Sequence, residues 1–238
     1  MKKCLIVVPL FNEESSLPDL INNIKKLDYD QSKVKCNVLF INDGSTDRSN
    51  KILKLNGVNY LTLVNNLGIG GAVQCGYMYA YNNDYDYVIQ IDGDGQHPPS
   101  QINKLIFAAT KFDEDLIIGS RFISKSDYKP SIPRKVGMIY SSLLMRINAR
   151  VKISDTTSGF RLTKRRLIHY FSKNYPQNEA GLISLFIAAK GGFKFKEIPI
   201  QIRERQHGKS SINVLRALLY PSKAIINLIA VTIMRTND

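Results

Sequence analysis

The chain has 238 residues, of which 44% are hydrophobic and 22% are charged. This length and composition are typical of one large α/β domain, with room for a short appendage. The three cysteines are an odd number and include no Cys-x-x-Cys spacing. A disulfide framework and a structural zinc site are therefore excluded, and a reducing, cytoplasmic compartment is expected.

The formal net charge is +13, which predicts attraction to an anionic partner. Nucleic acid, anionic lipid headgroups and phosphorylated substrates all have the required charge. Lysine and arginine are spread along the chain rather than gathered in one arm. A basic surface that only keeps the protein soluble is therefore the alternative.

Short apolar runs alternate with helical patterns through the first half of the chain. In the first helical pattern, apolar residues from Leu17 to Leu27 share one face, with Ser16 at the N-cap position and Pro18 in the first turn. Further helices are expected to begin near Arg48 and Gly70. Strands are expected at residues 3–8, 36–42, 60–64, 87–91 and 115–120.

Nearly uniform apolar strands that alternate with helices predict a mostly parallel sheet with helices on both faces. In such a sheet, ligands bind at the carboxyl ends of the strands. The polar and glycine-rich segments that follow the strands are therefore expected to lie along one edge and to form the functional site.

The segment Tyr87–Pro99, YVIQIDGDGQHPP, ends a predicted strand with two carboxylates. It is not an EF-hand loop, because the glycine at the sixth position and the glutamate at the twelfth are missing. Asp92 and Asp94 can instead hold Mg²⁺ or Mn²⁺ together with waters and substrate phosphates, and Gln96 can add a neutral oxygen. For this motif alone, a turn rich in Asp and Gly without a ligand is the alternative.

Two further segments follow predicted strands. In INDGSTD, Asp43 can accept hydrogen bonds from a nucleobase or a ribose hydroxyl, although Ser45 or Thr46 could instead cap a helix. The segment NLGIGGA lacks the third glycine of a dinucleotide fingerprint. Its Gly70 can nevertheless let a diphosphate or a sugar approach the backbone.

Two polar segments of the second half combine arginine with serine and glycine: DTTSGFRL, Asp155–Leu162, and RERQHGKSS, Arg203–Ser211. Guanidinium, hydroxyl and backbone N–H groups together are typical of phosphate binding, and Arg205 is one candidate ligand. A surface turn is the alternative for each segment. Arg121 follows the last predicted strand and belongs to the same edge.

Together, these segments resemble the family 2 glycosyltransferases, which have a GT-A fold. VVPLFNEE, NDGSTD, NLGIGGA, IDGDGQHPP and DTTSGFRL occur in the order of that family, and the resemblance covers about residues 3 to 211. The Gln-His-Pro after the two aspartates, the GSR, the SGFR and the R-x-x-G-x-S ending are most similar to one branch. That branch contains dolichyl-phosphate mannose synthases and bacterial polyprenyl-phosphate glycosyltransferases, which transfer a sugar to a polyprenyl phosphate at the membrane.

The resemblance implies a GT-A catalytic domain over residues 1–211 and an apolar helical segment over residues 212–238. For the nucleotide sugar it implies contacts from residues at the ends of the first, second and fourth predicted strands and from the glycine loop. These residues are Pro9, Phe11, Glu13, Asp43, Gly70 and Asp92.

For the metal, the resemblance implies Asp92, Asp94 and Gln96 as ligands. It implies catalytic roles for Asp94, Arg121 and Arg161. The acceptor phosphate would be bound by one serine and four arginines of the second half: Arg121, Arg134, Ser158, Arg161 and Arg205.

The expected reaction is a metal-dependent, inverting transfer of a hexose or N-acetylhexosamine to a polyprenyl phosphate. UDP is the expected nucleotide of the donor, with GDP as the alternative. A phosphate acceptor is already anionic and needs no general base, and the segment QNEAGLISLF offers no Glu-Asp pair. A glycan hydroxyl in cell-wall or surface polysaccharide synthesis is the first alternative, with Glu179 as base. A sugar nucleotidyltransferase and a non-catalytic basic binding protein are the others.

Ser211–Asp238 is the most apolar part of the chain. Its uncharged stretch, Ala224–Met234, is well short of the roughly 20 residues that a membrane span requires. It fits a helix in the membrane interface or docked on a membrane partner, with a helix packed on the protein's own core as the alternative. We expect peripheral association with the anionic inner face of the plasma membrane, a small membrane protein or a second copy as partner, and no nucleic acid.

Overall fold

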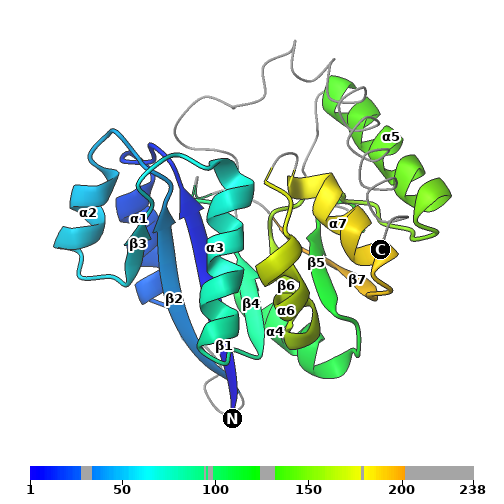
Figure 1. Cartoon of the computed structure of the whole chain (residues 1–238), viewed down its shortest axis with the longest axis horizontal. Helices are drawn as coiled ribbons and strands as arrows, with labels where there is room; N and C mark the ends of the chain where they lie inside the picture. Colours follow the sequence, from blue (N-terminus) through cyan, green and yellow to red (C-terminus); the bar gives the residue numbers. More distant parts are fainter. Residues whose placement is uncertain (28–33, 94, 96–98, 124–131, 178–179, 202–238) are drawn as a thin grey trace.

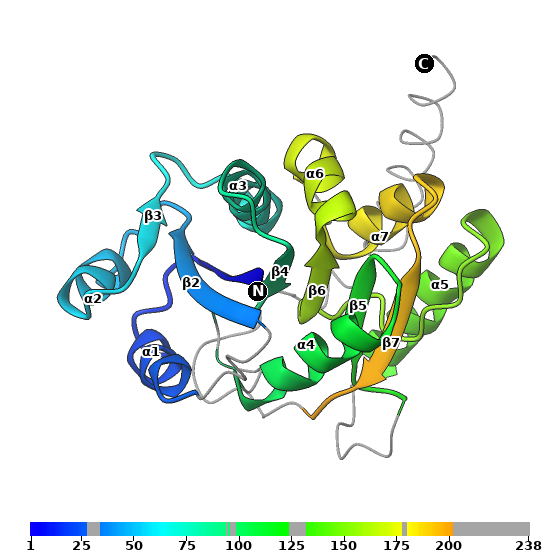
Figure 2. The same cartoon turned by 90° about the horizontal axis from the view of Figure 1, so that it is seen from below.

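The computed structural model of the chain describes residues 1–27, 34–93, 95, 99–123, 132–177 and 180–201. Seven strands form one sheet with helices on both faces (Figures 1 and 2). The strands are β1 (Lys2–Leu10), β2 (Val34–Asn42), β3 (Tyr60–Thr62), β4 (Tyr87–Gln90), β5 (Leu116–Ser120), β6 (Arg161–Lys164) and β7 (Phe195–Pro199). The α-helices are α1 (Leu17–Lys25), α2 (Ser49–Leu55), α3 (Gly68–Asn82), α4 (Ile102–Lys111), α5 (Ile132–Asn148), α6 (Arg165–Asn174) and α7 (Ala180–Lys190).

The strand order in the sheet is β3-β2-β1-β4-β6-β5-β7, and only β6 runs antiparallel to its neighbours. The mostly parallel sheet and all five predicted strands are confirmed, with small shifts at the strand ends. The sequence patterns did not indicate β6 and β7. β6 is short and has a charged residue at each end, and β7 is a half-buried strand at the edge of the sheet.

The two faces of the sheet belong to two hydrophobic clusters. Leu5 and Val7 of β1 pack in one cluster with residues of α3, α6 and α7. Cys4 and Ile6, which point the other way, pack in the second cluster with residues of α1 and α4. Because successive side chains of a strand alternate between the faces, a strand buried on both sides is apolar throughout, and this explains the uniform runs in the sequence.

The start of α1 differs from its prediction in one respect. Pro18 lies in the first turn as expected, but the Ser16 hydroxyl makes no capping hydrogen bond to the helix backbone. It is instead hydrogen-bonded to the carboxylate of Glu13 (2.8 Å) and to the carbonyl of Gly93 (3.1 Å). Ser16 therefore joins the segment after β1 to the segment after β4.

Within the described ranges, no helix combines the length and the apolar character needed to cross a membrane. Residues 212–238, with the helices predicted there, lie outside the described part of the chain. The division into residues 1–211 and 212–238 therefore stays a prediction.

Candidate functional site

One edge of the sheet collects the polar segments of both halves of the chain. The carboxyl ends of β1, β2, β4 and β5 lie there, together with the amino end of β6, because β6 is antiparallel to β4 and β5. Residues 149–160, which lead into β6, therefore return to the edge that also carries the segments after β2 and β4. The reversal of one strand brings the DTTSGF segment to the predicted site.

The residues predicted for the nucleoside lie where β1 and β2 end side by side. Pro9 is buried within β1, Phe11 is exposed just beyond it, and Glu13 is half-buried. Asp43 is buried, and its carboxylate accepts the backbone N–H of Leu67 (2.8 Å). The structure brings these four residues to one end of the site edge, and their contact with a nucleoside stays a prediction.

The segment after β2 does not begin a helix at Ser45 or Thr46. The helix α2 begins at Ser49, and the two earlier residues contact Asn12 in the segment after β1. The Asn12 side-chain carbonyl accepts the Thr46 N–H (2.8 Å), and the Ser45 hydroxyl accepts the Asn12 N–H (3.0 Å). These polar residues therefore order the loops along the edge instead of capping α2.

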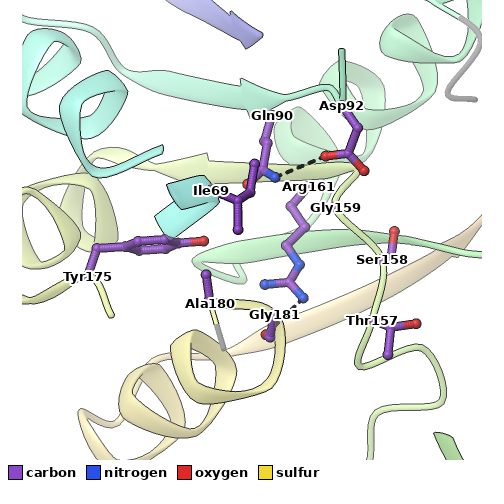
Figure 3. Close-up of a pocket in the computed structure, with 10 residues that line it drawn as sticks. All are labelled: Ile69, Gln90, Asp92, Thr157, Ser158, Gly159, Arg161, Tyr175, Ala180 and Gly181. Carbon is purple, nitrogen blue, oxygen red and sulfur yellow. Dashed lines mark hydrogen bonds between the residues drawn. The ribbon is translucent and has the colours of Figure 1, made fainter. Parts of the chain in front are cut away.

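A cavity of about 170 Å³ opens on the same edge (Figure 3). It is smaller than the roughly 300–1,000 Å³ of pockets that enclose a whole drug-sized ligand, so it accommodates part of a larger ligand. Residues from α3, β4 and the segment after it, the segment before β6, β6 itself, the segment after α6 and the start of α7 line it. They are Ile69, Gln90, Asp92, Thr157, Ser158, Gly159, Arg161, Tyr175, Ala180 and Gly181.

Arg161 is the cationic group of this cavity and is 4% exposed. Its guanidinium donates to the Ser184 hydroxyl (3.0 Å) and to the carbonyls of Thr156 and Gly181 (3.1 Å each). Its Nε has no partner, and no carboxylate of the described residues forms an ion pair with it. Because a buried charge without a counter-charge is costly, the arrangement favours an anionic ligand.

Asp92 is the one carboxylate among the described residues that line the cavity. Gln90 donates to its Oδ1 (3.3 Å), as Figure 3 shows. The carboxylate also lies directly against Gly159, where an added Cβ would be 2.5 Å from Oδ1. Glycine at position 159 is therefore required by the close approach of Asp92 to the segment before β6.

Arg121 has partners other than the phosphate that was predicted for it. It is 4% exposed and donates to both carboxylate oxygens of Asp155 (2.7 and 2.6 Å) and to the Thr157 hydroxyl (2.6 Å). Burial alone would raise the pKa of the Asp155 carboxyl, but the hydrogen bonds and the charge of Arg121 outweigh this effect and lower the pKa. The pair orders the cavity wall, and a direct contact between Arg121 and a phosphate stays a prediction.

The fold uses two other predicted ligands in ways that the sequence patterns did not indicate. The Ser158 hydroxyl is buried and donates to the carbonyl of Gly119 in β5 (2.6 Å). Its single hydrogen is therefore engaged by the fold in this structure, and a contact between Ser158 and a phosphate stays a prediction. Gly70 is buried, and an added Cβ would overlap the carbonyl oxygens of Pro176 and Gln177. Glycine at position 70 thus allows α3 to pack on residues 176–177, and the approach of a ligand to its backbone stays a prediction.

Asp94, Gln96, Glu179 and Arg205 lie outside the described residues, as does the side chain of Arg134, whose backbone is in α5. In the described part of the chain, no three His, Cys, Asp or Glu residues cluster as a metal site. The surroundings of Asp92 still fit Mg²⁺ or Mn²⁺. Such ions are commonly held by one or two carboxylates, with waters and substrate phosphates as the other ligands.

Gln90 and Tyr175 are cavity residues that the motifs did not indicate. Gln90 offered a signal, because it is a polar residue inside an apolar strand. Tyr175 offered none, since the packing of the segment after α6 is what points its hydroxyl into the cavity (Figure 3). Burial raises the pKa of the Tyr175 phenol, so the hydroxyl stays protonated at neutral pH and can donate a hydrogen bond.

Comparisons with known proteins agree with this architecture. A family model described as glycosyl transferase family 2 matches residues 5–171. UDP-N-acetylglucosamine–dolichyl-phosphate N-acetylglucosaminyltransferase of Methanococcus voltae is 26% identical over 220 residues, which cover 84% of this chain and 85% of that protein. Polyprenol monophosphomannose synthase of Mycolicibacterium smegmatis is 23% identical over 226 residues, which cover 89% of this chain and 82% of that protein.

Among solved structures, glucosyl-3-phosphoglycerate synthase from Mycobacterium tuberculosis, in complex with Mn²⁺, UDP and glucosyl-3-phosphoglycerate, has a similar fold. The TM-score is 0.70 at 16% sequence identity, and the match covers 96% of this chain and 78% of that one. The family match spans most of the chain, from within β1 to within α6. It favours sugar transfer over the nucleotidyltransferase and the non-catalytic binding protein that the sequence left open. The chain therefore belongs to glycosyltransferase family 2, and it is a glycosyltransferase with the GT-A fold.

Proposed function

We propose that this enzyme transfers a hexose or N-acetylhexosamine from a UDP-linked donor to a polyprenyl phosphate, with inversion at the anomeric carbon. The observation that carries the proposal is the buried guanidinium of Arg161, which faces the cavity and, among the described residues, donates hydrogen bonds to neutral groups only. A phosphate would supply the missing negative charge and accept charge-assisted hydrogen bonds. The names of the relatives from M. voltae and M. smegmatis, which contain dolichyl phosphate and polyprenol, support this class of acceptor.

In the proposed reaction, an oxygen of the acceptor phosphate attacks the anomeric carbon from the face opposite the diphosphate. The new C–O bond forms while the bond to the diphosphate breaks, and UDP leaves with the electron pair. Arg161 would hold the acceptor phosphate in position, while Ser184 and the carbonyls of Thr156 and Gly181 hold its guanidinium. Positioning of this kind supplies a large share of the rate acceleration in enzymes.

The cavity also favours a phosphate over a hydroxyl as the nucleophile. A hydroxyl acceptor needs a general base, usually a carboxylate, whereas a phosphate is already anionic at neutral pH. Among the described lining residues, Asp92 is the only acid, and the same carboxylate is the one that fits a metal ion. A glycan hydroxyl would require a second carboxylate in the same cavity, and Glu179, the candidate base for that reaction, lies outside the described residues.

Asp92 would hold Mg²⁺ or Mn²⁺ together with Asp94 and Gln96. When bound, such an ion stabilises the negative charge that develops on the leaving diphosphate. The role of the chain itself is to orient the Asp92 carboxylate, through the hydrogen bond from Gln90 and the contact with Gly159.

The proposed acceptor is a membrane lipid, so we place the reaction at the cytoplasmic face of the plasma membrane, with the enzyme peripherally attached. The net charge of +13 would attract anionic headgroups, each basic residue near the surface contributing about 1 kcal/mol. A small membrane protein or a second copy of the chain would complete the attachment.

The test is transfer of radiolabelled sugar from a panel of UDP- and GDP-sugars to undecaprenyl phosphate by the purified protein, with and without Mn²⁺. The expected result is a Mn²⁺-dependent lipid-linked sugar whose anomeric configuration is opposite to that of the donor. Transfer to an oligosaccharide hydroxyl, with none to the lipid phosphate, would overturn the proposed acceptor. Retention of configuration in the product would overturn the proposed inversion.

A further inference from the structure

Tyr175 is a cavity residue that the proposed reaction does not use. It is 6% exposed, and its hydroxyl points into the cavity beside Arg161 (Figure 3). Arg161 supplies a positive charge there. A phosphate has three acceptor oxygens, so one guanidinium leaves room for a second donor.

A neighbouring tyrosine, Tyr77 of α3, shows the usual fate of a buried hydroxyl. The rings of Tyr77 and Tyr175 pack on each other with their centroids 5.2 Å apart, and both residues belong to one hydrophobic cluster. The Tyr77 hydroxyl is hydrogen-bonded to the hydroxyl of Thr163 in β6 (2.9 Å), and Tyr77 does not line the cavity. The fold therefore uses the hydroxyl of Tyr77, whereas that of Tyr175 faces the cavity.

The position of Tyr175 is set by packing. Its ring lies edge-on against Phe171 of α6, with the centroids 5.0 Å apart and an angle of 85° between the planes. Its backbone is extended, with φ −74° and ψ 132°, as is favoured before a proline. The next two residues, Pro176 and Gln177, lie directly against Gly70 of α3. A donor that packing holds in place costs little to order when a ligand binds.

The Tyr175 hydroxyl is suited to donate to an anion. Burial is the largest influence on the phenol and raises its pKa, against the charge of Arg161 and a hydrogen bond with Ser184, which lower it. The phenol therefore keeps its hydrogen at neutral pH, and the O–H can turn about its C–O bond toward a ligand. The Ser184 hydroxyl already accepts from Arg161 (3.0 Å) and donates to the Gly181 carbonyl (3.1 Å).

The charges around the cavity favour an anion on the side of Tyr175. Figure 3 shows Tyr175 and Asp92 on different sides of Arg161. The Asp92 carboxylate would repel an anion unless a cation lay between them. Ala180 and Gly181, at the start of α7, also line the cavity, and the partial positive charge at the amino end of a helix adds to the attraction of Arg161.

We propose that the Tyr175 hydroxyl donates a hydrogen bond to the same anion that Arg161 binds. The guanidinium supplies the charge, and the phenol fixes the orientation of the anion, so that one of its oxygens is directed toward the side of Asp92. With the acceptor phosphate as the anion, that oxygen is the nucleophile, a consequence that rests on the proposed function. Binding of an anion by Arg161 and Tyr175 together does not depend on it.

Titration calorimetry of the full chain with inorganic phosphate, at constant ionic strength, tests the contact without lipid or nucleotide. Tyr175→Phe removes the hydroxyl and keeps the ring. It should weaken phosphate binding by about tenfold or more, because a hydrogen bond to a charged group is lost. Binding that remains in Arg161→Met measures any other phosphate site and is subtracted.

Tyr77→Phe is the matched control, because it removes the hydroxyl of the adjacent buried tyrosine. That hydroxyl is bonded to Thr163 and not directed into the cavity, so the phosphate affinity should stay at the wild-type value. Circular dichroism and urea unfolding check that each variant is folded.

A spectroscopic measurement on the wild-type protein does not depend on how a variant folds. The chain contains 12 tyrosines and no tryptophan, so phenols dominate its near-ultraviolet absorption. Phosphate should produce a tyrosine difference spectrum, because a phenol that donates to an anion changes its absorption. The difference should persist in Tyr77→Phe and disappear in Tyr175→Phe.

Three results would overturn the proposal. The wild type could show no phosphate binding that depends on Arg161, or Tyr175→Phe could bind phosphate as tightly as the wild type. Alternatively, Tyr77→Phe could weaken binding as much as Tyr175→Phe does, which would make the effect one of packing.

Kinetics separate this proposal from the proposed function. In Tyr175→Phe, the KM for undecaprenyl phosphate should rise about tenfold, while the KM for the nucleotide sugar should not change. A rise confined to the nucleotide sugar would contradict the contact with the acceptor. Phosphate binding that depends on Tyr175, in a protein without transfer to lipid phosphate, would support the contact and overturn only the proposed acceptor.

Discussion

Two buried arginines border the segment before β6, and they differ in what neutralises them. Arg121 and Arg161 are equally buried, at 4% exposure each. Arg121 donates to both oxygens of Asp155. In the described part of the chain, Arg161 donates only to a hydroxyl and to carbonyls. The first cation forms an ion pair inside the fold, whereas the second forms none with the described residues and faces a cavity.

The comparison shows that two similar arginine motifs differ in role: one arginine is paired within the fold, and the other is available to a ligand. GSR and SGFR look alike as basic segments of the sequence, and both were assigned to a phosphate. The two arginines differ in charge balance. A guanidinium that donates to both oxygens of a buried carboxylate is already neutralised and has few N–H groups left for a ligand. Arg161 is therefore the residue on which the proposed function depends, and Arg121 positions the wall around it.

The largest effect is expected from breaking the ion pair between Arg121 and Asp155. Asp155→Ala should destabilise the protein by about 3–5 kcal/mol, because it leaves the buried Arg121 charge uncompensated. Urea unfolding followed by circular dichroism measures the loss. The double variant Arg121→Met/Asp155→Leu removes both charges and should recover most of the stability. Equal instability of the single and double variants would contradict the interpretation of this pair.

Arg161→Met should have the opposite profile, with a large loss of activity and little loss of stability. Removal of one group that positions or stabilises the reacting charge typically lowers kcat by about 10²–10³-fold. Unfolding by urea should show unchanged or higher stability, since a buried charge without a counter-charge has been removed.

Arg165→Met is the control for this prediction. Arg165 forms an exposed ion pair with Asp84, so its loss should cost less than about 1 kcal/mol and leave the rate unchanged. If Arg161→Met unfolded the protein as Asp155→Ala is expected to do, the two arginines would not differ in the way that the structure indicates.

A smaller effect is expected from a substitution of Gly159, which lies in the segment before β6 that forms part of the cavity wall. Gly159→Ala places a Cβ 2.5 Å from Asp92 Oδ1, which forces the carboxylate to move and should cost about 1–3 kcal/mol of stability. The Mn²⁺ concentration for half-maximal activity should rise, because the displaced carboxylate would hold an ion less well. Gly181→Ala is the matched control in the same cavity, since the nearest atom to its added Cβ is 3.7 Å away. An unchanged Mn²⁺ dependence in Gly159→Ala would argue against Asp92 as a ligand.

The smallest effect is expected in the pH dependence of stability that arises from the ion pair between Asp155 and Arg121. The pKa of the Asp155 carboxyl is lowered in the folded protein by Arg121, against the effect of burial. Its contribution to stability is therefore complete above the unfolded pKa of about 3.9 and is lost as the pH falls through the lower folded value. Urea unfolding between pH 6 and 3 should show this loss in the wild type and a shallower pH dependence in Asp155→Asn. Identical slopes in the two proteins would contradict the ion pair as its source.

The order of elements and the site edge follow from local patterns in the first half of the chain. Each parallel strand from β1 to β5 is an apolar run of its own, and a carboxylate after such a run must lie at the carboxyl edge. This reasoning placed Asp43 and Asp92 without any knowledge of the packing. It could not place Tyr175, because no periodicity marks a residue that enters a cavity from the segment after a helix.

The amino-acid sequence by itself determined the α/β class, the mostly parallel sheet and the family, because these depend on local periodicity and on the order of short motifs. The tertiary structure alone decided that β6 is reversed, that Asp155 neutralises Arg121, and that Ser158 donates to β5. Those outcomes depend on which distant groups meet in space, and on how burial forces each charge and each hydroxyl to find a partner. For that reason the residue types of the site could be predicted, whereas their division between holding the fold and binding the ligand could not.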